Sequence, residues 1–196
     1  MQVQNCFLLS YVKYGDNDAV LHCFSAENGF QSFFAKGIYA AKNKKKPYLL
    51  PLNLLSITIA KTVAENSIAR ISKIELAPNH YDFEEVSLNS IVFFTADFLH
   101  QVLREEGKNH LLFTEIEAVR KEISLKNYDA YLVFIFKFLI ISGVAPLKGD
   151  QKFLNPESGL FEDEISHLFF NETISMLWKR FLNADNGYEI RLKRSE

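Results

Sequence analysis

The chain has 196 residues, 48% of them hydrophobic and 14% aromatic, which is enough for one large domain or two small ones. The formal net charge of −2 conceals an asymmetry. Residues 1–75 contain nine Lys and Arg against five Asp and Glu, whereas residues 76–196 contain thirteen against nineteen. A basic first part and an acidic second part indicate different binding partners.

Several protein classes are excluded by the sequence pattern. Two cysteines, Cys6 and Cys23, cannot form a disulfide framework or, alone, a four-ligand zinc site, and we expect both to be small buried side chains. The longest apolar run, residues 131–141, is interrupted by Lys137 and is too short to span a bilayer. The first residues lack the pattern of a signal peptide. These features predict a protein of the reducing cytoplasm.

The first part of the chain has the composition of short strands separated by tight turns. Strands are predicted over residues 4–14, 19–24, 30–35, 50–63 and 67–76. In the second half of the fourth strand, Ile57 and Ile59 alternate with smaller or polar residues. Five short strands joined by tight turns favour a small closed β-barrel, for which the oligonucleotide-binding (OB) fold is the leading candidate.

After Pro78 the apolar residues recur at helical spacing. Helices are predicted over residues 86–104, 111–123, 128–142 and 173–182, with an irregular segment over 143–164 in which Leu160 and Phe161 touch the core. The third helix is apolar almost all round and is expected at the centre of a bundle. The predicted fold class is α+β, with a five-stranded OB-fold barrel in residues 1–78 and an all-α helical domain in residues 79–196.

A strongly basic stretch, residues 35–52, joins the third and fourth predicted strands, and we call it the lysine loop. Five lysines fall within eleven residues that contain no acid, and two tyrosines accompany them: Lys36, Lys42, Lys44, Lys45, Lys46, Tyr39 and Tyr48. Positive charge beside aromatic rings suits a phosphate backbone with stackable bases. The alternative is a solvated loop whose lysines only keep the protein soluble.

Other residues of the first part would extend this surface. Lys13, Lys61 and Arg70 lie on predicted strands and are candidate phosphate contacts, although isolated strand lysines also protect sheet edges. Phe34, together with the two tyrosines of the lysine loop, is a candidate for stacking on bases at about 1–3 kcal/mol each. The alternative for these rings is burial in the barrel. The sequence therefore predicts a nucleic-acid interface on the barrel.

Four short motifs follow one another through the predicted barrel. They are Tyr14-Gly15-Asp16-Asn17-Asp18, Phe24-Ser25-x-Glu27-x-Gly29, Ala35-Lys36-Gly37, and Leu50 and Leu52 around Pro51. In this order and spacing they resemble the bacterial RecO family of DNA-repair proteins. A later segment, Phe153 to Phe161 with Ser158-Gly159, is similar to the family more loosely.

The resemblance to RecO implies a non-enzymatic recombination mediator, cytoplasmic and nucleoid-associated, without a cofactor. Such proteins bind single- and double-stranded DNA, anneal complementary strands, and help RecA to load together with RecR and the C-terminal tail of single-stranded-DNA-binding protein. Some members hold zinc through cysteines of the helical part. No zinc is expected here, because no cysteine follows Cys23. Family members usually continue with another helix beyond the position of Glu196, so the chain is expected to be shortened there.

The acidic helical part is the predicted protein-binding surface. A tail of acidic and apolar residues needs an apolar groove with a cationic rim, and Trp178 with Lys179 and Arg180 would supply one. The alternative is that Trp178 anchors the core and the two cations are solvated.

Enzyme classes and a second binding function are the alternatives. Asp97-x-x-His100 and Glu164-x-x-His167 have the spacing of helical metal sites, but a di-iron bundle needs two further inward-facing glutamates. No nucleophile-elbow, phosphate-cradling or zinc-protease motif is present. The other binding function is a general RNA- or single-stranded-DNA-binding OB-fold module with a helical interaction domain.

Overall fold

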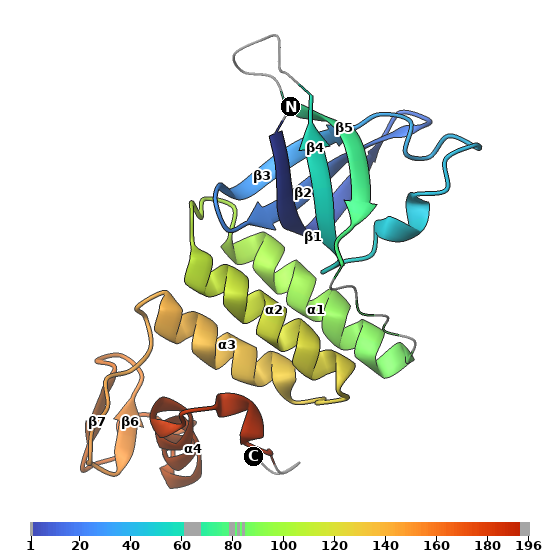
Figure 1. The fold of residues 1–196 in the computed structure, drawn as a ribbon. Coiled ribbons are helices and arrows are strands. Elements are labelled where there is room, and N and C mark those ends of the chain that lie inside the picture. Colours follow the sequence, from blue (N-terminus) through green and yellow to red (C-terminus); the bar gives the residue numbers. More distant parts are fainter. Residues whose placement is uncertain (1, 61–67, 79–80, 82, 84, 193–196) are drawn as a thin grey trace. The chain divides into compact units, whose positions relative to one another are not determined.

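The computed structural model describes residues 2–60, 68–78, 81, 83 and 85–192 (Figure 1). The chain divides into two compact units, Met1–Lys126 and Asn127–Glu196, which we call the barrel unit and the carboxyl-terminal unit. Among the described residues, the barrel unit holds five strands and two α-helices. The described part of the carboxyl-terminal unit holds two further α-helices and a short hairpin.

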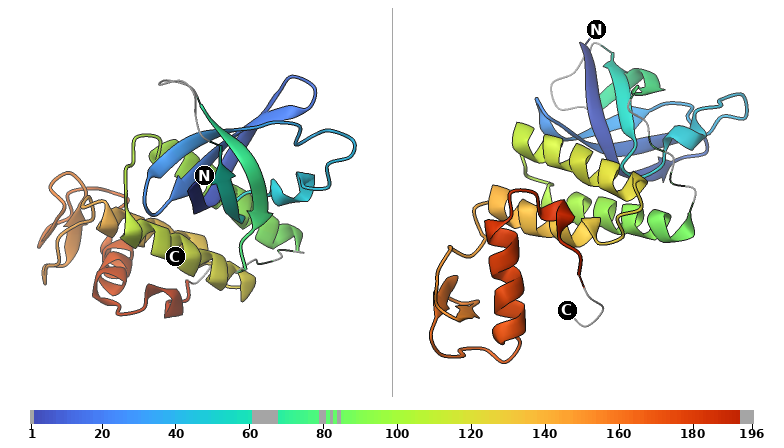
Figure 2. Two further views of the ribbon diagram at one scale, coloured as in Figure 1. Left: turned by 45° about the horizontal axis from the view of Figure 1, so that its top comes forward. Right: turned by 60° about the horizontal axis from the view of Figure 1, so that its bottom comes forward.

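Five strands form the barrel: β1 (Gln2–Tyr14), β2 (Asp18–Ser25), β3 (Gly29–Ala35), β4 (Leu54–Ile59) and β5 (Ala69–Leu76). They close in the order β1-β2-β3-β5-β4, and β4 pairs back onto β1. The β3–β5 pair is parallel and the other pairs are antiparallel. Figure 2 shows the same barrel from two further directions. The predicted five-stranded OB-fold barrel is confirmed.

Side chains that alternate along the strands fill the barrel interior, as the pleat of a strand requires. Cys6 and Leu8 belong to this interior cluster on β1, and Leu21 and Cys23 belong to it on β2. The register of β1 against β2 shifts between Leu8 and Ser10. Such a bulge adds one residue to one strand, so the interior-facing positions of β1 change from even to odd numbers beyond it.

A second set of buried residues lies outside the interior cluster and meets the helices. Phe7 and Phe24 are buried without belonging to that cluster. Helix α2 (His110–Ser124) reaches this face, where the ring centroid of Phe113 lies 4.6 Å from that of Phe7. Helix α1 (Val86–Val102) packs against β1. Both predicted helices of this part are confirmed.

The turn between α1 and α2 also contacts the β2–β3 hairpin. The amide of Phe30 donates a hydrogen bond to the carbonyl of Glu106 at 2.9 Å. This close approach requires a residue without a side chain, because a Cβ added to Gly29 would lie 2.2 Å from the same carbonyl oxygen. Gly29 also has a φ of +68°, which glycine adopts without steric cost.

The fourth strand is shorter than predicted. Residues 50–53 form a turn instead of extending the strand, because Leu52 has a φ of +58° and its amide donates to a carbonyl of β1 at 2.7 Å. The predicted alternation holds within β4, where Ile57 is buried and Ile59 packs against the barrel core. Residues 61–63 of the predicted strand lie outside the described residues.

The carboxyl-terminal unit contains α3 (Ala130–Ile141) and α4 (Glu172–Asn183), which confirm the last two predicted helices. The prediction that residues 143–164 are irregular is wrong in one part. Within them β6 (Phe153–Asn155) pairs antiparallel with β7 (Leu160–Glu162).

Local turn chemistry explains this hairpin. The side-chain oxygen of Asn155 accepts a hydrogen bond from the amide of Glu157 at 2.9 Å, and Gly159 has a φ of +68°. Both features are typical of tight turns. Phe161 is buried, as predicted, whereas Leu160 is exposed.

Helices α3 and α4 meet through aromatic rings, with the centroids of Phe136 and Phe181 4.0 Å apart. The central place predicted for α3 in a helical bundle stays a prediction, as does the domain boundary at Pro78. Helices α1 and α2 follow Pro78 and belong to the barrel unit. Among the described residues, no helix combines the length and apolar character needed to cross a membrane.

Candidate nucleic-acid interface

The lysine loop is attached at its start to the β1–β2 turn. Gly37 has a φ of +66°, and its amide donates to Oδ1 of Asp18 at 2.6 Å. The amide of Tyr39 donates to the carbonyl of Asn17 at 2.8 Å. The first and third sequence motifs therefore form the base of the lysine loop.

Further along, hydrogen bonds within the lysine loop define its course. Asn43 donates through Nδ2 to the carbonyl of Gly37 and accepts from the amide of Lys45, each at 2.9 Å. A short 3-10 helix, η1 (Lys46–Tyr48), follows. Pro47 lies in its first turn, where the fixed φ of proline suits a helical start and the missing N–H is not needed.

The five lysines project from this backbone. Four of them are exposed, and Lys45 is half-buried. No carboxylate among the described residues forms an ion pair with any of the five. A depression of about 550 Å³ on the lysine loop is lined by Gly37, Ala40, Lys42, Asn43, Lys44, Lys45 and Tyr48. The positive charge is therefore available to an external anion.

The two tyrosines of the lysine loop pack against the barrel core and remain half-buried. The Nζ atoms of Lys13 and Lys46 each lie 5.8 Å from the ring centroid of Tyr39, within the range of cation–π attraction. Burial, followed by the neighbouring Tyr11, raises the pKa of Tyr39. The sequence left burial and base stacking open for Tyr39 and Tyr48, and in the structure each ring is only partly covered.

Tyr11 is the residue of this surface that the sequence analysis missed. Beyond the bulge in β1, Tyr11 and Lys13 pair with Leu21 and Ala19, whose side chains belong to the barrel interior. Tyr11 and Lys13 therefore lie on the interior-facing side, at the mouth of the barrel. Tyr11 is 39% exposed. The two-residue spacing of Tyr11 and Lys13 indicates that they share one side of the strand. The bulge that turns this side toward the barrel interior was not visible in the sequence.

The structure does not bring all predicted residues together. Arg70 pairs with Phe34 across β5 and β3, on the outer face of the barrel, whereas Lys13 is on the interior-facing side. Phe34 is half-buried there, and Tyr14 meets it edge-to-face with centroids 5.8 Å apart. Lys61 lies outside the described residues.

Both cysteines lie inside the barrel. Cys6 and Cys23 are buried free thiols, which confirms their prediction as small buried side chains. A hydrogen bond with Cys6, together with burial, raises the pKa of the Cys23 thiol well above its usual value. A thiol kept protonated is a poor nucleophile and metal ligand. The two side chains therefore act as packing residues of the barrel core.

Among the described residues, the two carboxylate–histidine spacings noted in the sequence do not belong to a larger cluster. Within the described ranges, no group of three or more His, Cys, Asp or Glu side chains is placed to hold a metal ion. Asp97 accepts a hydrogen bond from Nε2 of Gln101 at 2.7 Å. Glu164 and His167 lie in an exposed segment that is not helical.

In the carboxyl-terminal unit, Trp178 is half-buried and meets Phe136 edge-to-face with centroids 4.4 Å apart. The Nζ of Lys179 donates to the carbonyl of Asp150 at 2.9 Å. Arg180 is exposed. Trp178 thus packs on α3, and the partner-binding role of Trp178, Lys179 and Arg180 stays a prediction.

Residues 1–79 match the sequence profile of a family described as "Recombination protein O N terminal". DNA repair protein RecO of Flavobacterium psychrophilum is 30% identical over 210 aligned residues, which span 100% of this chain and 86% of that protein. The proteins of the same name from Phocaeicola vulgatus and Christiangramia forsetii are 26% and 23% identical, spanning 94% and 91% of this chain and 76% and 77% of their own. The chain belongs to the RecO family.

Membership of the RecO family identifies a DNA repair and recombination protein that binds DNA. The RecO motifs of the sequence lie where the barrel turns. Gly15, Gly29 and Gly37 have φ values of +59°, +68° and +66°, in the β1–β2 turn, the β2–β3 turn and the start of the lysine loop. The motifs at Gly15 and Gly37 therefore lie at the base of the lysine loop, whereas Gly29 forms the turn that contacts the carbonyl of Glu106.

Proposed function

We propose that the protein binds single- and double-stranded DNA through the lysine loop and the adjoining mouth of the barrel, and anneals complementary strands. The observation that supports this most directly is the set of five lysines without an ion-pair partner among the described residues. Partly accessible tyrosine rings lie beside these charges. Lys13 adds a further cation at the mouth.

The proposed mechanism begins with charge. Lysines replace the counterions condensed on phosphates, an attraction that depends little on sequence and acts on both kinds of DNA. Tyr39 and Tyr48 would then stack on bases of a single strand, at about 1–3 kcal/mol each. A protein that neutralises two strands at once lowers their mutual repulsion, which favours annealing. These steps require no covalent chemistry, so we propose a non-enzymatic mediator.

The proposed partners are RecR, RecA and the C-terminal tail of single-stranded-DNA-binding protein, with the protein assisting RecA loading on coated DNA. For the tail we propose the surface around Trp178, where Arg180 is exposed and Lys179 is held by the carbonyl of Asp150. A tail peptide titrated against the chain should change the fluorescence of Trp178, the single tryptophan. An unchanged signal would remove Trp178 from this surface.

The lysine loop is tested by changing Lys44, Lys45 and Lys46 together to Glu. Four lysine–phosphate contacts with single-stranded DNA give a slope of log affinity against log salt of about −3, or roughly a fifty-fold loss between about 50 and 200 mM salt. The triple variant should bind much more weakly, and its slope should be less steep by about two. Fluorescence anisotropy with a labelled oligonucleotide measures both quantities.

Lys108→Glu is the matched control for the single change Lys44→Glu. Lys108 is exposed on the turn between α1 and α2, which contacts the β2–β3 hairpin. We expect Lys44→Glu to weaken binding and Lys108→Glu to leave it close to that of the unmodified chain. If the triple variant keeps both affinity and slope, the lysine loop is not the DNA-binding surface.

An annealing assay distinguishes a recombination mediator from a general RNA- or DNA-binding module. The substrate is complementary DNA precoated with single-stranded-DNA-binding protein, either intact or lacking its C-terminal tail. A mediator should anneal the DNA coated with the intact protein and lose activity when the tail is absent. Tight binding to RNA and DNA alike, without annealing, would favour the general module.

A further inference from the structure

Arg120, on α2, is the largest fully enclosed side chain among the described residues. It is 1% exposed, and it lies four residues after Ile116 and three before Ile123, on the buried stripe of the helix. Its Nε and Nη2 atoms have no hydrogen-bond acceptor within the described part of the chain. Buried charged groups in proteins are normally paired, so these two donors require an explanation.

The surroundings of Arg120 stabilise its charge without satisfying its donors. The guanidinium carbon lies 5.2 Å from the ring centroids of both Phe7 and Tyr81. Aromatic faces attract a cation but offer no in-plane acceptor to its N–H groups. Burial lowers the pKa of Arg120 to about 10, opposed by Tyr81 and Glu117. The side chain is therefore still charged at neutral pH.

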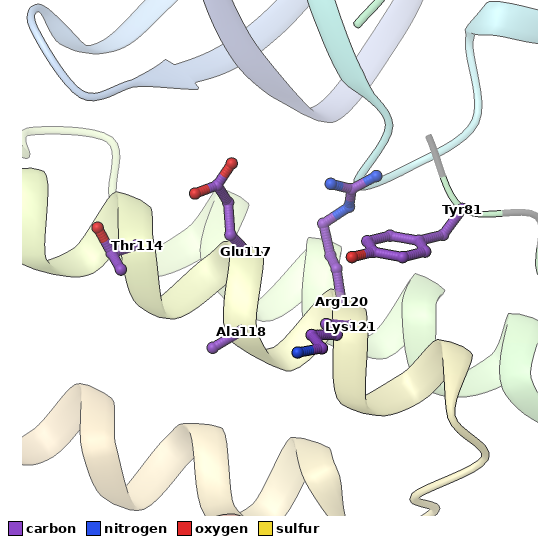
Figure 3. A pocket seen from close by; sticks show the side chains of 6 residues that line it. All are labelled: Tyr81, Thr114, Glu117, Ala118, Arg120 and Lys121. Atoms are coloured by element: carbon purple, nitrogen blue, oxygen red, sulfur yellow. The ribbon is translucent and has the colours of Figure 1, made fainter. Parts of the chain in front are cut away.

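A pocket lies beside Arg120 (Figure 3). It has a volume of about 280 Å³ and is lined by Tyr81, Thr114, Glu117, Ala118, Arg120 and Lys121. One water molecule takes up roughly 30 Å³ in the liquid, so the pocket admits a polyatomic ligand. Figure 3 shows the ring of Tyr81 beside Arg120 and the carboxylate of Glu117 on the same side of α2 as the guanidinium. The ammonium of Lys121, which also lines the pocket, lies on the other side of the helix.

We propose that this pocket is an oxyanion site in which Arg120 binds one phosphate-type or carboxylate group. The two donors without an acceptor, Nε and Nη2, lie on the same edge of the guanidinium. That edge forms two parallel hydrogen bonds with a bidentate oxyanion. Both nitrogens are enclosed beside the ring of Tyr81 in this structure, so the proposal requires that ring to turn aside when the anion binds.

Nuclear magnetic resonance of the arginine Nε–H groups tests this directly in the full chain. The ¹⁵N-labelled protein is titrated with inorganic phosphate, and separately with acetate, at constant ionic strength maintained with sodium chloride. The Arg120 signal should shift and saturate in at least one titration, before the signals of the exposed arginines move. The anion that saturates at the lower concentration identifies the preferred chemistry.

Three variants define the site further. Lys121→Gln should lower the affinity for the saturating anion about two- to fivefold, because an exposed neighbouring charge contributes little more than this to binding. Lys108→Gln, which removes a lysine outside the pocket, should not change the affinity. In Arg120→Met the Nε–H signal of Arg120 disappears, which identifies that signal. If this variant does not fold, through-bond assignment in the unmodified chain identifies the signal instead.

The proposal does not depend on the DNA-binding function. A chain with Lys44, Lys45 and Lys46 changed to Glu should show the same Arg120 response as the unmodified chain. Loss of the response in that variant would place the anion at the lysine loop and overturn the proposal. An Arg120 signal that never saturates while the exposed arginines shift would also overturn it, leaving Arg120 as a packing residue only.

Discussion

Two glycines with the same backbone conformation have different surroundings in the barrel. Gly15 and Gly29 both have positive φ, at +59° and +68°. A Cβ added to Gly15 would meet nothing within 4 Å, whereas one added to Gly29 would lie 2.2 Å from the carbonyl oxygen of Glu106. Comparing substitutions at the two glycines therefore separates the free-energy cost of a positive φ from that of a steric collision.

Gly29→Ala should destabilise the chain more than Gly15→Ala. The left-handed conformation alone costs about 1–2 kcal/mol for a residue with a Cβ, and both variants share this loss. At Gly29 the Glu106 carbonyl must also move, which breaks its hydrogen bond with Phe30 and costs about 1–3 kcal/mol more. Urea unfolding followed by circular dichroism measures both free energies. Equal losses would mean that the turn between α1 and α2 does not press on Gly29.

For single residues, the face on which a side chain lies could be inferred from the sequence at some positions and not at others. The helical spacing of Arg120 from Ile116 and Ile123 places it on a buried stripe, so the conflict between position and charge was visible in the sequence. Tyr11 was not recoverable in the same way. The side of the barrel on which Tyr11 lies depends on the bulge between Leu8 and Ser10, and the residue types do not predict that bulge.

At the level of elements, β2, β3 and α1 meet through a group of aromatic rings. The ring centroids of His22 and His100 are 5.2 Å apart, and Phe30 lies 5.9 Å from each. Burial, with His100 and Arg104 nearby, lowers the pKa of His22. Burial and Arg104 lower the pKa of His100, while Asp97 opposes this. Both rings are therefore harder to protonate in the folded chain.

These two histidines should make the folding free energy depend on pH. The unfolded chain binds protons at each histidine near pH 6.5, where the folded chain binds fewer, so stability rises with pH. The stability associated with the two neutral histidines is fully present above about pH 7.5. It is lost as the pH falls from about 6.5 toward the lowered pKa values of the folded chain. A His22→Gln, His100→Gln double variant should lose less unfolding free energy between about pH 7.5 and 5.5 than the unmodified chain.

Urea unfolding at the two pH values measures this difference. His110→Gln is the matched control, because His110 is exposed at the start of α2, and it should behave as the unmodified chain does. If the double variant has the same pH dependence as the unmodified chain, the contact between α1 and the β2–β3 hairpin does not exclude protons from these rings.

Most elements could be predicted because their periodicity is produced by burial on one face. The strands before Pro78 and all four helices follow from spacings of two and of three to four residues. The misplaced segments are those in which local backbone chemistry decides. Leu52 takes a positive φ that its residue type does not suggest, and Asn155 with Gly159 turns a short hairpin too brief for alternation to show.

At the scale of the whole molecule, the barrel and the two helices after it share one buried layer. Phe7 and Phe24 are fully buried outside the barrel interior. Phe7 meets Phe113 and the guanidinium of Arg120, both on α2. The candidate interface at the lysine loop therefore stands on a barrel whose outer face depends on residues well beyond Pro78.

A fragment of residues 1–126 should fold and bind DNA, whereas a fragment of residues 1–78 should not fold. Removing α1 and α2 would expose Phe7, which contacts Phe113 of α2. We expect the same of Leu9 and Phe24, which are also buried outside the barrel interior, and each of the three is at most 2% exposed in the full chain. Burial of one such side chain is worth about 1.5–3 kcal/mol, so three amount to a loss comparable with the roughly 5–15 kcal/mol that stabilises a domain.

Dispersion of amide signals and the salt slope of oligonucleotide binding measure folding and function in both fragments. Residues 1–126 should reproduce the slope of the full chain, because the whole lysine loop and its supports lie within them. A folded fragment of residues 1–78 with the same slope would show instead that the domain boundary lies at Pro78. The helices would then be a separate layer that the barrel does not need, and the burial of Phe7 would contribute little to its stability.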